Sequence, residues 1–325
     1  MRGSRGEFWR VAFAALALVG LTACPQLLRD DFSVDVGGHL AASAPDASVK
    51  SPGPARASRD GGPGPTPPSE LDAGNTGDPG GPDAAPLSPV QIALRAALAH
   101  RYRFDSAAPL LDSVGGANAV SIGATFNAGA AVLAGDGEYI DLPNGLLSGL
   151  RNATFEIWVI WDVTDPTDST SAWQRIFDLG RNLTSVEGQQ CEVDADATSL
   201  YLTPRTNAGS LQLKCETCGE TQIQTAGLAV GVLVQLVAVV NDDANLFSLY
   251  RNGELVASPA FSGSIATITN CSARPAPCDW NNWIGRSQHI EDPSFQGKIL
   301  DFRIYSAALD APLIRDSFSA GPDLD

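Results

Sequence analysis

The pattern of hydrophobic and polar positions divides the chain into a short apolar leader, a long polar stretch and a region of short alternating segments. In the last region, β-branched and apolar runs end at clusters of Asn, Asp and Gly, which is typical of strands joined by turns. Asn252-Gly253 lies between two such runs, and this dipeptide favours a tight hairpin turn. The strands that this pattern predicts in the C-terminal half are 233–240, 246–250, 254–257, 283–287 and 298–305.

The remainder of this region adds more short strands and little helix. Residues 90–99 contain helix formers with spaced apolar positions and predict one short helix, and Tyr102 begins the first strand. Residues 200–203 and 211–214 predict another hairpin. Short strands separated by Gly, Asn, Asp and Pro turns indicate an all-β fold, a sandwich of two antiparallel sheets.

The N-terminal segment 1–23 has the pattern of an export signal. Three arginines within the first ten residues precede the apolar residues 11–21, a run too short to span a bilayer. The segment ends in Leu-Thr-Ala before Cys24, which resembles the lipobox of bacterial lipoproteins. The resemblance implies acylation of Cys24 and anchoring to a membrane. The alternative is an ordinary secretory signal with an incidental cysteine.

Residues 24–89 are rich in Pro, Gly, Ala, Ser and Asp and show no sustained period of 2 or 3.6. Such a composition cannot bury enough apolar surface to offset the entropy of ordering, so it predicts a disordered tether. A flexible chain of this length reaches about 45 Å, enough to hold a domain clear of lipid head groups. Residue 25 is Pro rather than Asp, which favours the outer membrane or cell surface as the destination.

Residues 90–325 form the predicted globular domain, long enough for one large sandwich. This region has 14 Lys and Arg against 27 Asp and Glu, a net charge of −13. A surface this acidic argues against nucleic acid and anionic lipid as partners. It is compatible with divalent cations and neutral glycans, and equally with an acidic surface that has no partner.

Taken together, the order of these segments and their residue patterns resemble laminin-G-like jelly rolls of the concanavalin A-like lectin/glucanase superfamily. The resemblance extends from about residue 102 to 309 and is patchy between 182 and 226. It implies a jelly-roll sandwich and a binding module for a glycan or a protein rather than an enzyme. The segments that carry it are 112–118, 135–143, 153–159, 233–240, 246–257, 283–287 and 298–305.

The glucanases of that superfamily place several carboxylates on one face of a catalytic strand, because a retaining glycosidase needs two of them. In the comparable strand of this chain Glu156 is present, but Trp158 and Trp161 stand where the other carboxylates would be required. We therefore expect a scaffold strand with Trp158 in the core, and no enzyme. A glucanase remains the alternative, and it would need a second carboxylate near Glu156.

The resemblance also implies a structural Ca²⁺ on the outer face, held by the Asp before the last strand. Asp301 matches that position, and Asp105 would lie outward on the first strand beside it. Carboxylate oxygens suit calcium. The alternative is that Asp301 and Asp105 pair with Arg103 and Arg303 across neighbouring strands.

Five cysteines lie in the globular region, and export would permit disulfides. Cys271 and Cys278 bracket a short loop and are expected to pair. Cys191 precedes the 200–214 hairpin and is expected to pair with Cys215 or Cys218, which leaves one of those two free. A redox or zinc role for the single C-x-x-C has no supporting second ligand pair.

Sugar sites require an exposed aromatic ring beside amides and carboxylates. Trp280, Asn281 and Asn282 supply such groups next to the cysteine loop, and Trp173 stands at the start of another strand. Core packing is the alternative for each tryptophan. The sequence therefore predicts an exported lipoprotein that displays a non-catalytic glycan- or protein-binding module, or else a purely structural or adhesive domain.

Overall fold

The structure is a computed structural model, and it describes residues 87–104, 109–182, 186–191, 197–219, 221–271 and 277–322. Contacts divide the chain into two units, Met1–Ala84 and Ala85–Asp325. All of the described residues belong to the second unit. No helix within them is long and apolar enough to cross a membrane.

The second unit consists mainly of short strands, with a helix near each end. Its elements in chain order are α1 (Pro89–Ala97), β1 (Leu98–Tyr102), β2 (Val120–Ile122), β3 (Thr125–Asn127), β4 (Ala130–Ala134), β5 (Tyr139–Leu142), β6 (Asn152–Trp161), the 3-10 helix η1 (Ser169–Ser171), β7 (Phe177–Asn182), β8 (Ala197–Thr203), β9 (Ser210–Glu216), β10 (Gln222–Ala226), β11 (Leu233–Asn241), β12 (Leu246–Arg251), β13 (Glu254–Ala257), α2 (Ala266–Thr269), β14 (Asn281–Ile284), β15 (Gln296–Tyr305) and α3 (Ala311–Ala320).

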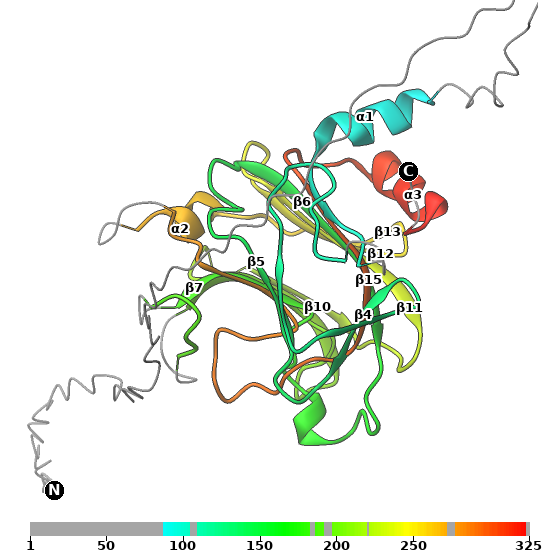
Figure 1. The fold of residues 1–325 in the computed structure, drawn as a ribbon. Coiled ribbons are helices and arrows are strands. Elements are labelled where there is room, and N and C mark those ends of the chain that lie inside the picture. Colours follow the sequence, from blue (N-terminus) through cyan, green and yellow to red (C-terminus); the bar gives the residue numbers. More distant parts are fainter. Residues whose placement is uncertain are drawn as a thin grey trace, which may run out of the picture. The chain divides into compact units, whose positions relative to one another are not determined.

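Within the described residues the strands form two antiparallel sheets. The eight-stranded sheet has the order β13-β12-β11-β6-β15-β4-β3, with β1 paired to β15, and the seven-stranded sheet has the order β10-β9-β8-β7-β14-β5-β2. The sheets face each other, and α1 and α3 lie outside the eight-stranded one (Figure 1). Neighbours such as β6 and β15 are far apart in sequence, so the chain crosses repeatedly between the two sheets.

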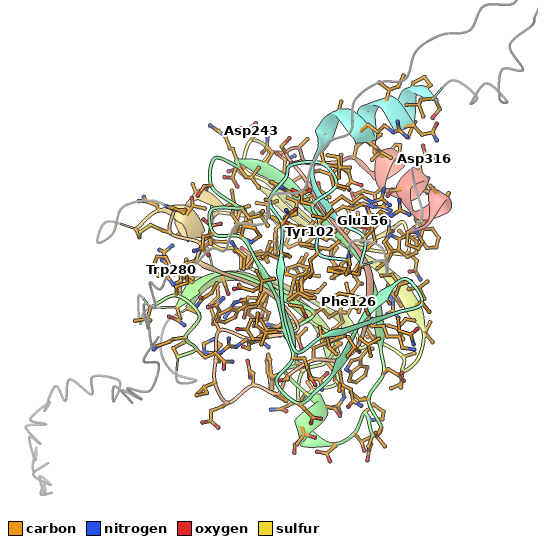
Figure 2. The ribbon with its side chains drawn as sticks, viewed as in Figure 1. Tyr102, Phe126, Glu156, Asp243, Trp280 and Asp316 are labelled. Carbon is orange, nitrogen blue, oxygen red and sulfur yellow. A yellow bond between two sulfur atoms is a disulfide. The ribbon has the colours of Figure 1, made fainter. Side chains whose placement is uncertain are left out.

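The space between the sheets is filled by apolar side chains from alternate strand positions. On β6, Phe155, Ile157 and Trp161 point into this core, which also contains Tyr102 (Figure 2). Glu156 and Trp158 alternate with them and therefore face the opposite side. Trp158, expected in the core, is buried at 4% exposure, but it lies beneath α3 rather than between the sheets, since its ring stacks on Phe318 at 5.8 Å.

Tight turns at the predicted places hold these strands together. Asn252 and Gly253 have φ of 52° and 77°, the left-handed conformation that a two-residue hairpin of this type requires. Asn252 is also fixed from the neighbouring strand, since its Oδ1 accepts the Gln235 N–H at 3.0 Å. The hairpin β12–β13 is thus confirmed, as is the hairpin β8–β9.

The two terminal helices form a second, smaller apolar layer on the outer face of the eight-stranded sheet. Ser88 caps α1 reciprocally: its Oγ accepts the Gln91 N–H, and Gln91 Oε1 accepts the Ser88 N–H at 2.8 Å. Leu94 of α1 and Ile314 of α3 pack with Tyr305 of β15 in this layer. The helices therefore shield that face from solvent.

Two details of the strands differ from the sequence prediction. The first strand ends at Tyr102 rather than beginning there. On β15 a bulge between Ile299 and Asp301 interrupts the strict alternation of a strand, so that Ile299, Phe302 and Ile304 enter the core and Leu300 does not. A bulge adds one residue to one strand only, and alternation in a single sequence cannot reveal it.

Candidate functional site

A pocket of about 470 Å³ opens at the outer face of the seven-stranded sheet. Phe177, Leu200 and Ile284 point into the core, so the residues that alternate with them, such as Asp178, Tyr201 and Trp283, lie on this outer face. The pocket is lined by Gly137, Tyr139, Gly188, Gln190, Arg286, Ile290, Asp292 and Ser294.

The floor of the pocket is built around Arg286. Its guanidinium lies 4.5 Å from the ring centre of Tyr139 and 4.4 Å from that of Trp283. Tyr139 and Trp283 also meet edge to face at 5.9 Å. Arg286 Nη2 donates to Gln190 Oε1 at 3.2 Å, which fixes the orientation of the guanidinium within its plane. An aromatic ring, a cation and an amide are therefore held rigidly side by side.

One wall of the pocket is tied to the sheet through a second arginine. Arg175 Nη2 contacts Asp292 Oδ2 at 2.7 Å, and its Nε lies 3.5 Å from Asp178 Oδ2. The guanidinium also sits over the Tyr201 ring at 4.1 Å, and Nη1 donates to the Trp173 carbonyl at 2.6 Å. Burial raises the pKa of Asp178 to about 6, although Arg175 opposes the shift. Arg175 thus holds the pocket residue Asp292 in place.

His289, Cys191 and Glu216 form a cluster next to the pocket. His289 Nδ1 lies 3.8 Å from the Cys191 sulfur, and Nε2 lies 3.3 Å from Glu216 Oε2. Burial alone would lower the pKa of His289, but the contacts with Cys191 and Glu216 outweigh it and raise the pKa to about 10. The imidazole is therefore protonated at neutral pH, and it forms a charged pair with Glu216. Lys214 Nζ, 3.4 Å away, also contacts Glu216.

The disulfides agree in part with the prediction. Cys271 is bonded to Cys278, as predicted. Cys215 is bonded to Cys218 instead of Cys191, so the predicted link from Cys191 to either of them is not formed. The spacing within the C-x-x-C brings the two α-carbons to 5.4 Å, inside the usual range for a bridge, while Cys191 lies against His289.

The residues expected to form an exposed sugar platform are mostly interior. Trp280 is only 4% exposed, and Asn281 and Asn282 are fully buried. Asn281 Oδ1 accepts the Gly188 N–H at 2.9 Å, so it supports a pocket loop from behind. Trp173 is half-buried beside Arg175. The expectation of an exposed platform at 280–282 is wrong, because this segment enters the central strand β14.

Asp301 lies at the centre of a buried ionic cluster on the other sheet. Its carboxylate accepts from Arg101 Nε and Nη2 at 3.1 and 2.9 Å, and from Arg303 Nε and Nη2 at 2.9 and 2.6 Å. Burial raises the pKa of Asp301, and the two arginines oppose this. The ion-pair alternative therefore accounts for Asp301, with Arg101 in place of the predicted Arg103.

The surroundings of Asp301 do not supply the oxygen-rich set of ligands that calcium prefers. A calcium ion there would have to displace two guanidinium groups, and the described part of the chain contains no group of three or more His, Cys, Asp or Glu suited to a metal. The other predicted ligand, Asp105, lies outside the described residues, as does Cys24. The calcium prediction itself stays untested.

Glu156 belongs to the same cluster. It accepts hydrogen bonds from Trp158, Gln235, Arg303, Tyr305 and Ser317, at 2.8–3.2 Å. Figure 2 shows it beside the C-terminal helix. The second carboxylate that the sequence of β6 lacks is present nearby, because β15 brings Asp301 to the other side of Arg303. Both carboxylates are buried and occupied by donors from the protein.

Sequence reasoning missed the pocket residues themselves. Tyr139 and Arg286 lie in segments that were noted only as strand patterns, and Gln190 and Asp292 lie in loops. The closest available signal was Trp283 followed three residues later by Arg286, beside a strand that begins with Tyr139. Only the pairing of β14 with β5 shows that these groups meet.

Comparisons with known proteins agree with this architecture. The sequence model of the concanavalin A-like lectin/glucanases superfamily matches residues 134–315. No curated protein matches the chain. This match and the two antiparallel sheets confirm the predicted all-β jelly-roll sandwich.

Several solved structures are similar to the chain. A sialidase from Trypanosoma rangeli is 13% identical with a TM-score of 0.51, covering 70% of this chain and 33% of the sialidase. Domain 4 of an extracellular arabinanase from Geobacillus stearothermophilus, in complex with arabinotriose, is 21% identical with a TM-score of 0.49, covering 67% of this chain and 97% of that domain. The receptor binding domain of a botulinum neurotoxin of mosaic serotype C/D is 15% identical with a TM-score of 0.48, covering 70% of this chain and 52% of that domain.

Proposed function

Because the chain belongs to the concanavalin A-like lectin/glucanase superfamily, we propose that its folded domain is a non-catalytic module that binds a glycan in the pocket of Tyr139 and Arg286. The superfamily name joins lectins with glucanases, so sugars are the ligand class we favour. A protein ligand is the second choice, and a purely structural or adhesive role is the third.

The lining of the pocket is the observation that carries this proposal. It combines an aromatic ring, a guanidinium, an amide and a carboxylate, from Tyr139, Arg286, Gln190 and Asp292. Sugars offer hydroxyl groups for such polar partners and C–H faces for an aromatic ring. Because each polar group is already held by a neighbouring residue, little ordering cost remains for binding.

The state of the two clustered carboxylates supports a role without catalysis. Hydrolysis requires an acid and a nucleophile that reach the glycosidic bond. Glu156 and Asp301 are each 1% exposed and lie beneath α3, where Arg303 contacts both of them. A sugar could approach them only after α3 moved and Arg303 gave up its contacts.

We also propose that the domain is displayed at the cell surface or outer membrane through a lipid on Cys24. The support is the leader sequence together with two disulfides, Cys215–Cys218 and Cys271–Cys278, which are typical of exported proteins. The tether of residues 24–89 would then place the pocket away from the membrane.

A glycan array tests the ligand class and the site together. We expect the purified chain to bind a subset of glycans and Ile290→Ser to weaken that signal, because Ile290 lines the pocket and is 57% exposed. Leu255→Ser is the matched control, since Leu255 is 52% exposed on β13 of the other sheet. An array without signal would contradict glycan binding, and equal loss in both variants would contradict the site.

A further inference from the structure

A second pocket, of about 340 Å³, lies on the opposite side of the molecule, between α1 and strands β1 and β15. Among the described residues, nine line this pocket; three of them are arginines and none is acidic, although the domain as a whole carries a net charge of −13. Its lining consists of Gln91, Leu94, Arg95, Leu98, Arg101, Ser113, Val114, Arg303 and Tyr305.

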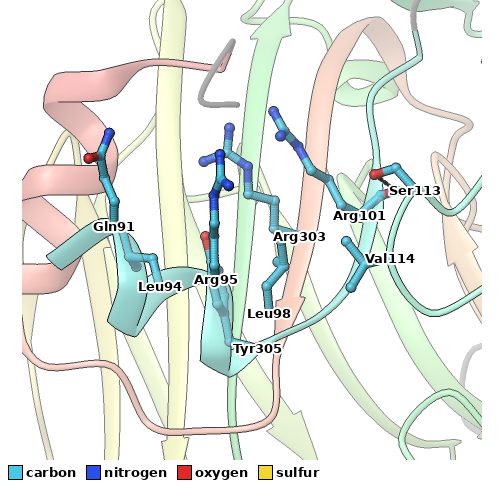
Figure 3. Close-up of a pocket in the computed structure, with 9 residues that line it drawn as sticks. All are labelled: Gln91, Leu94, Arg95, Leu98, Arg101, Ser113, Val114, Arg303 and Tyr305. Carbon is cyan, nitrogen blue, oxygen red and sulfur yellow. Dashed lines mark hydrogen bonds between the residues drawn. The ribbon is translucent and has the colours of Figure 1, made fainter. Parts of the chain in front are cut away.

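The pocket has a cationic end and an apolar end. Figure 3 shows the side chains of Arg95, Arg101 and Arg303 extending toward the same side, with Leu98 and Val114 below their charged groups. Within the described part of the chain, Asp301 and Glu156 are the carboxylates that pair with Arg101 and Arg303, and neither of them is among the pocket-lining residues. A ligand in the pocket therefore meets guanidinium groups, while the compensating charges lie behind them.

One face of α1 supplies the approach to this pocket. Gln91, Leu94 and Arg95 are spaced i, i+3 and i+4, so they lie on one face of α1, and Leu98 follows the helix directly as the first residue of β1. Arg95 is exposed in the last turn of α1, and Gln91, one turn before it, also lines the pocket. Arg303 donates to Asp301, Glu156, Ser317 and main-chain carbonyls, so its contribution is charge rather than a new hydrogen bond.

From this lining we propose that the pocket binds an organic carboxylate with an apolar body. The carboxylate would accept hydrogen bonds from the Arg95 guanidinium and from the Gln91 side-chain amide, since arginine can donate two parallel hydrogen bonds to a carboxylate. The apolar body would lie against Leu98 and Val114, and the pocket volume falls in the range of small-molecule sites. This site is separate from the glycan pocket and does not depend on it.

Calorimetric titration of the full chain with octanoate and 4-phenylbutyrate tests the proposal. We expect saturable binding of at least one of them, and none of acetate or octanol, which carry only the charge or only the apolar body. Arg95→Gln should weaken binding about tenfold or more, as the loss of a charge-assisted pair predicts. Val114→Ser should also weaken it, because Val114 is an exposed part of the apolar end.

Arg151→Gln is the matched control, because Arg151 is an exposed arginine away from this pocket that pairs with Asp243. It should leave binding unchanged, and Arg95→Gln should leave any glycan-array signal unchanged. Absence of binding for both carboxylates would overturn the proposal. So would binding that is the same in the wild type, Arg95→Gln and Val114→Ser.

Discussion

Replacing Asp301 with asparagine removes the charge at the centre of the buried ionic cluster. Asp301 Oδ2 receives four charge-assisted hydrogen bonds, two each from Arg101 and Arg303, and Arg101 Nε also contacts Oδ1 at 3.4 Å. Asparagine keeps one acceptor oxygen but turns an NH₂ group toward the guanidinium groups. Arg303, which is 1% exposed, would then retain only Glu156 as a charged partner among the residues that the structure describes.

Because all three groups are buried, the cost should be far larger than for a surface ion pair. Removing one partner of a buried pair typically costs about 3–5 kcal/mol, since the other charge stays desolvated. For a domain of this size, each kcal/mol lowers the melting temperature by roughly 2–4 °C, so the shift should be roughly 6–20 °C. The exposed pair Arg315–Glu254 provides the contrast, and Glu254→Gln should cost about 0–1 kcal/mol.

Urea unfolding at neutral pH, followed by tryptophan fluorescence, measures both variants. The same experiment with calcium and with EDTA tests the calcium prediction. A bound ion would stabilise the wild type by about 2.7 kcal/mol at a hundredfold excess over Kd, and Asp301→Asn would abolish this response. Because Arg101 and Arg303 occupy the Asp301 carboxylate, we expect neither calcium nor EDTA to change the free energy of unfolding. A loss below about 1 kcal/mol for Asp301→Asn would refute the reasoning on the buried cluster.

Three further predictions concern the anchor, catalysis and pH. Cys24→Ala should shift the protein from the detergent phase to the aqueous phase, and unchanged partitioning would contradict lipidation. The wild type should not hydrolyse β-glucans; turnover that disappears in Glu156→Gln would instead indicate an enzyme. The pKa of His289 is raised to about 10, so its stabilising contribution is complete below about 6.5 and is lost as pH rises through 10. The free energy of unfolding should fall over that interval, and less steeply in His289→Gln; equal slopes would refute the charged pair with Glu216.

Much of the fold follows from local patterns in the sequence. Apolar and β-branched runs such as β11, separated by turn signals such as Asn252-Gly253, are enough to predict a sandwich, because each signal acts within a few residues. The Cys271–Cys278 bridge follows for the same reason, since its loop is short. The β15 bulge could not be predicted, because it depends on the pairing with β6.

The candidate site depends on contacts between distant segments, and this is where sequence reasoning failed. The segment 280–282 has the residue types of a sugar platform, yet it is buried because β14 lies between β5 and β7 in the sheet. The burial of Trp158 agrees with the prediction, but no sequence pattern indicates that α3 is the element that covers it. Asp301 and Glu156 both contact Arg303, and β15 brings Asp301 and Arg303 to Glu156 because it pairs with β6.

The most direct test of the proposed binding site is a titration of the glycan that gives the strongest array signal into wild type and Tyr139→Ala. Tyr139 provides the aromatic ring of the pocket and contacts Arg286, so its removal should weaken binding about tenfold or more. Thermal melting of the variant checks that the sandwich remains folded. Unchanged affinity in a folded Tyr139→Ala would contradict the assignment of the ligand site to this pocket.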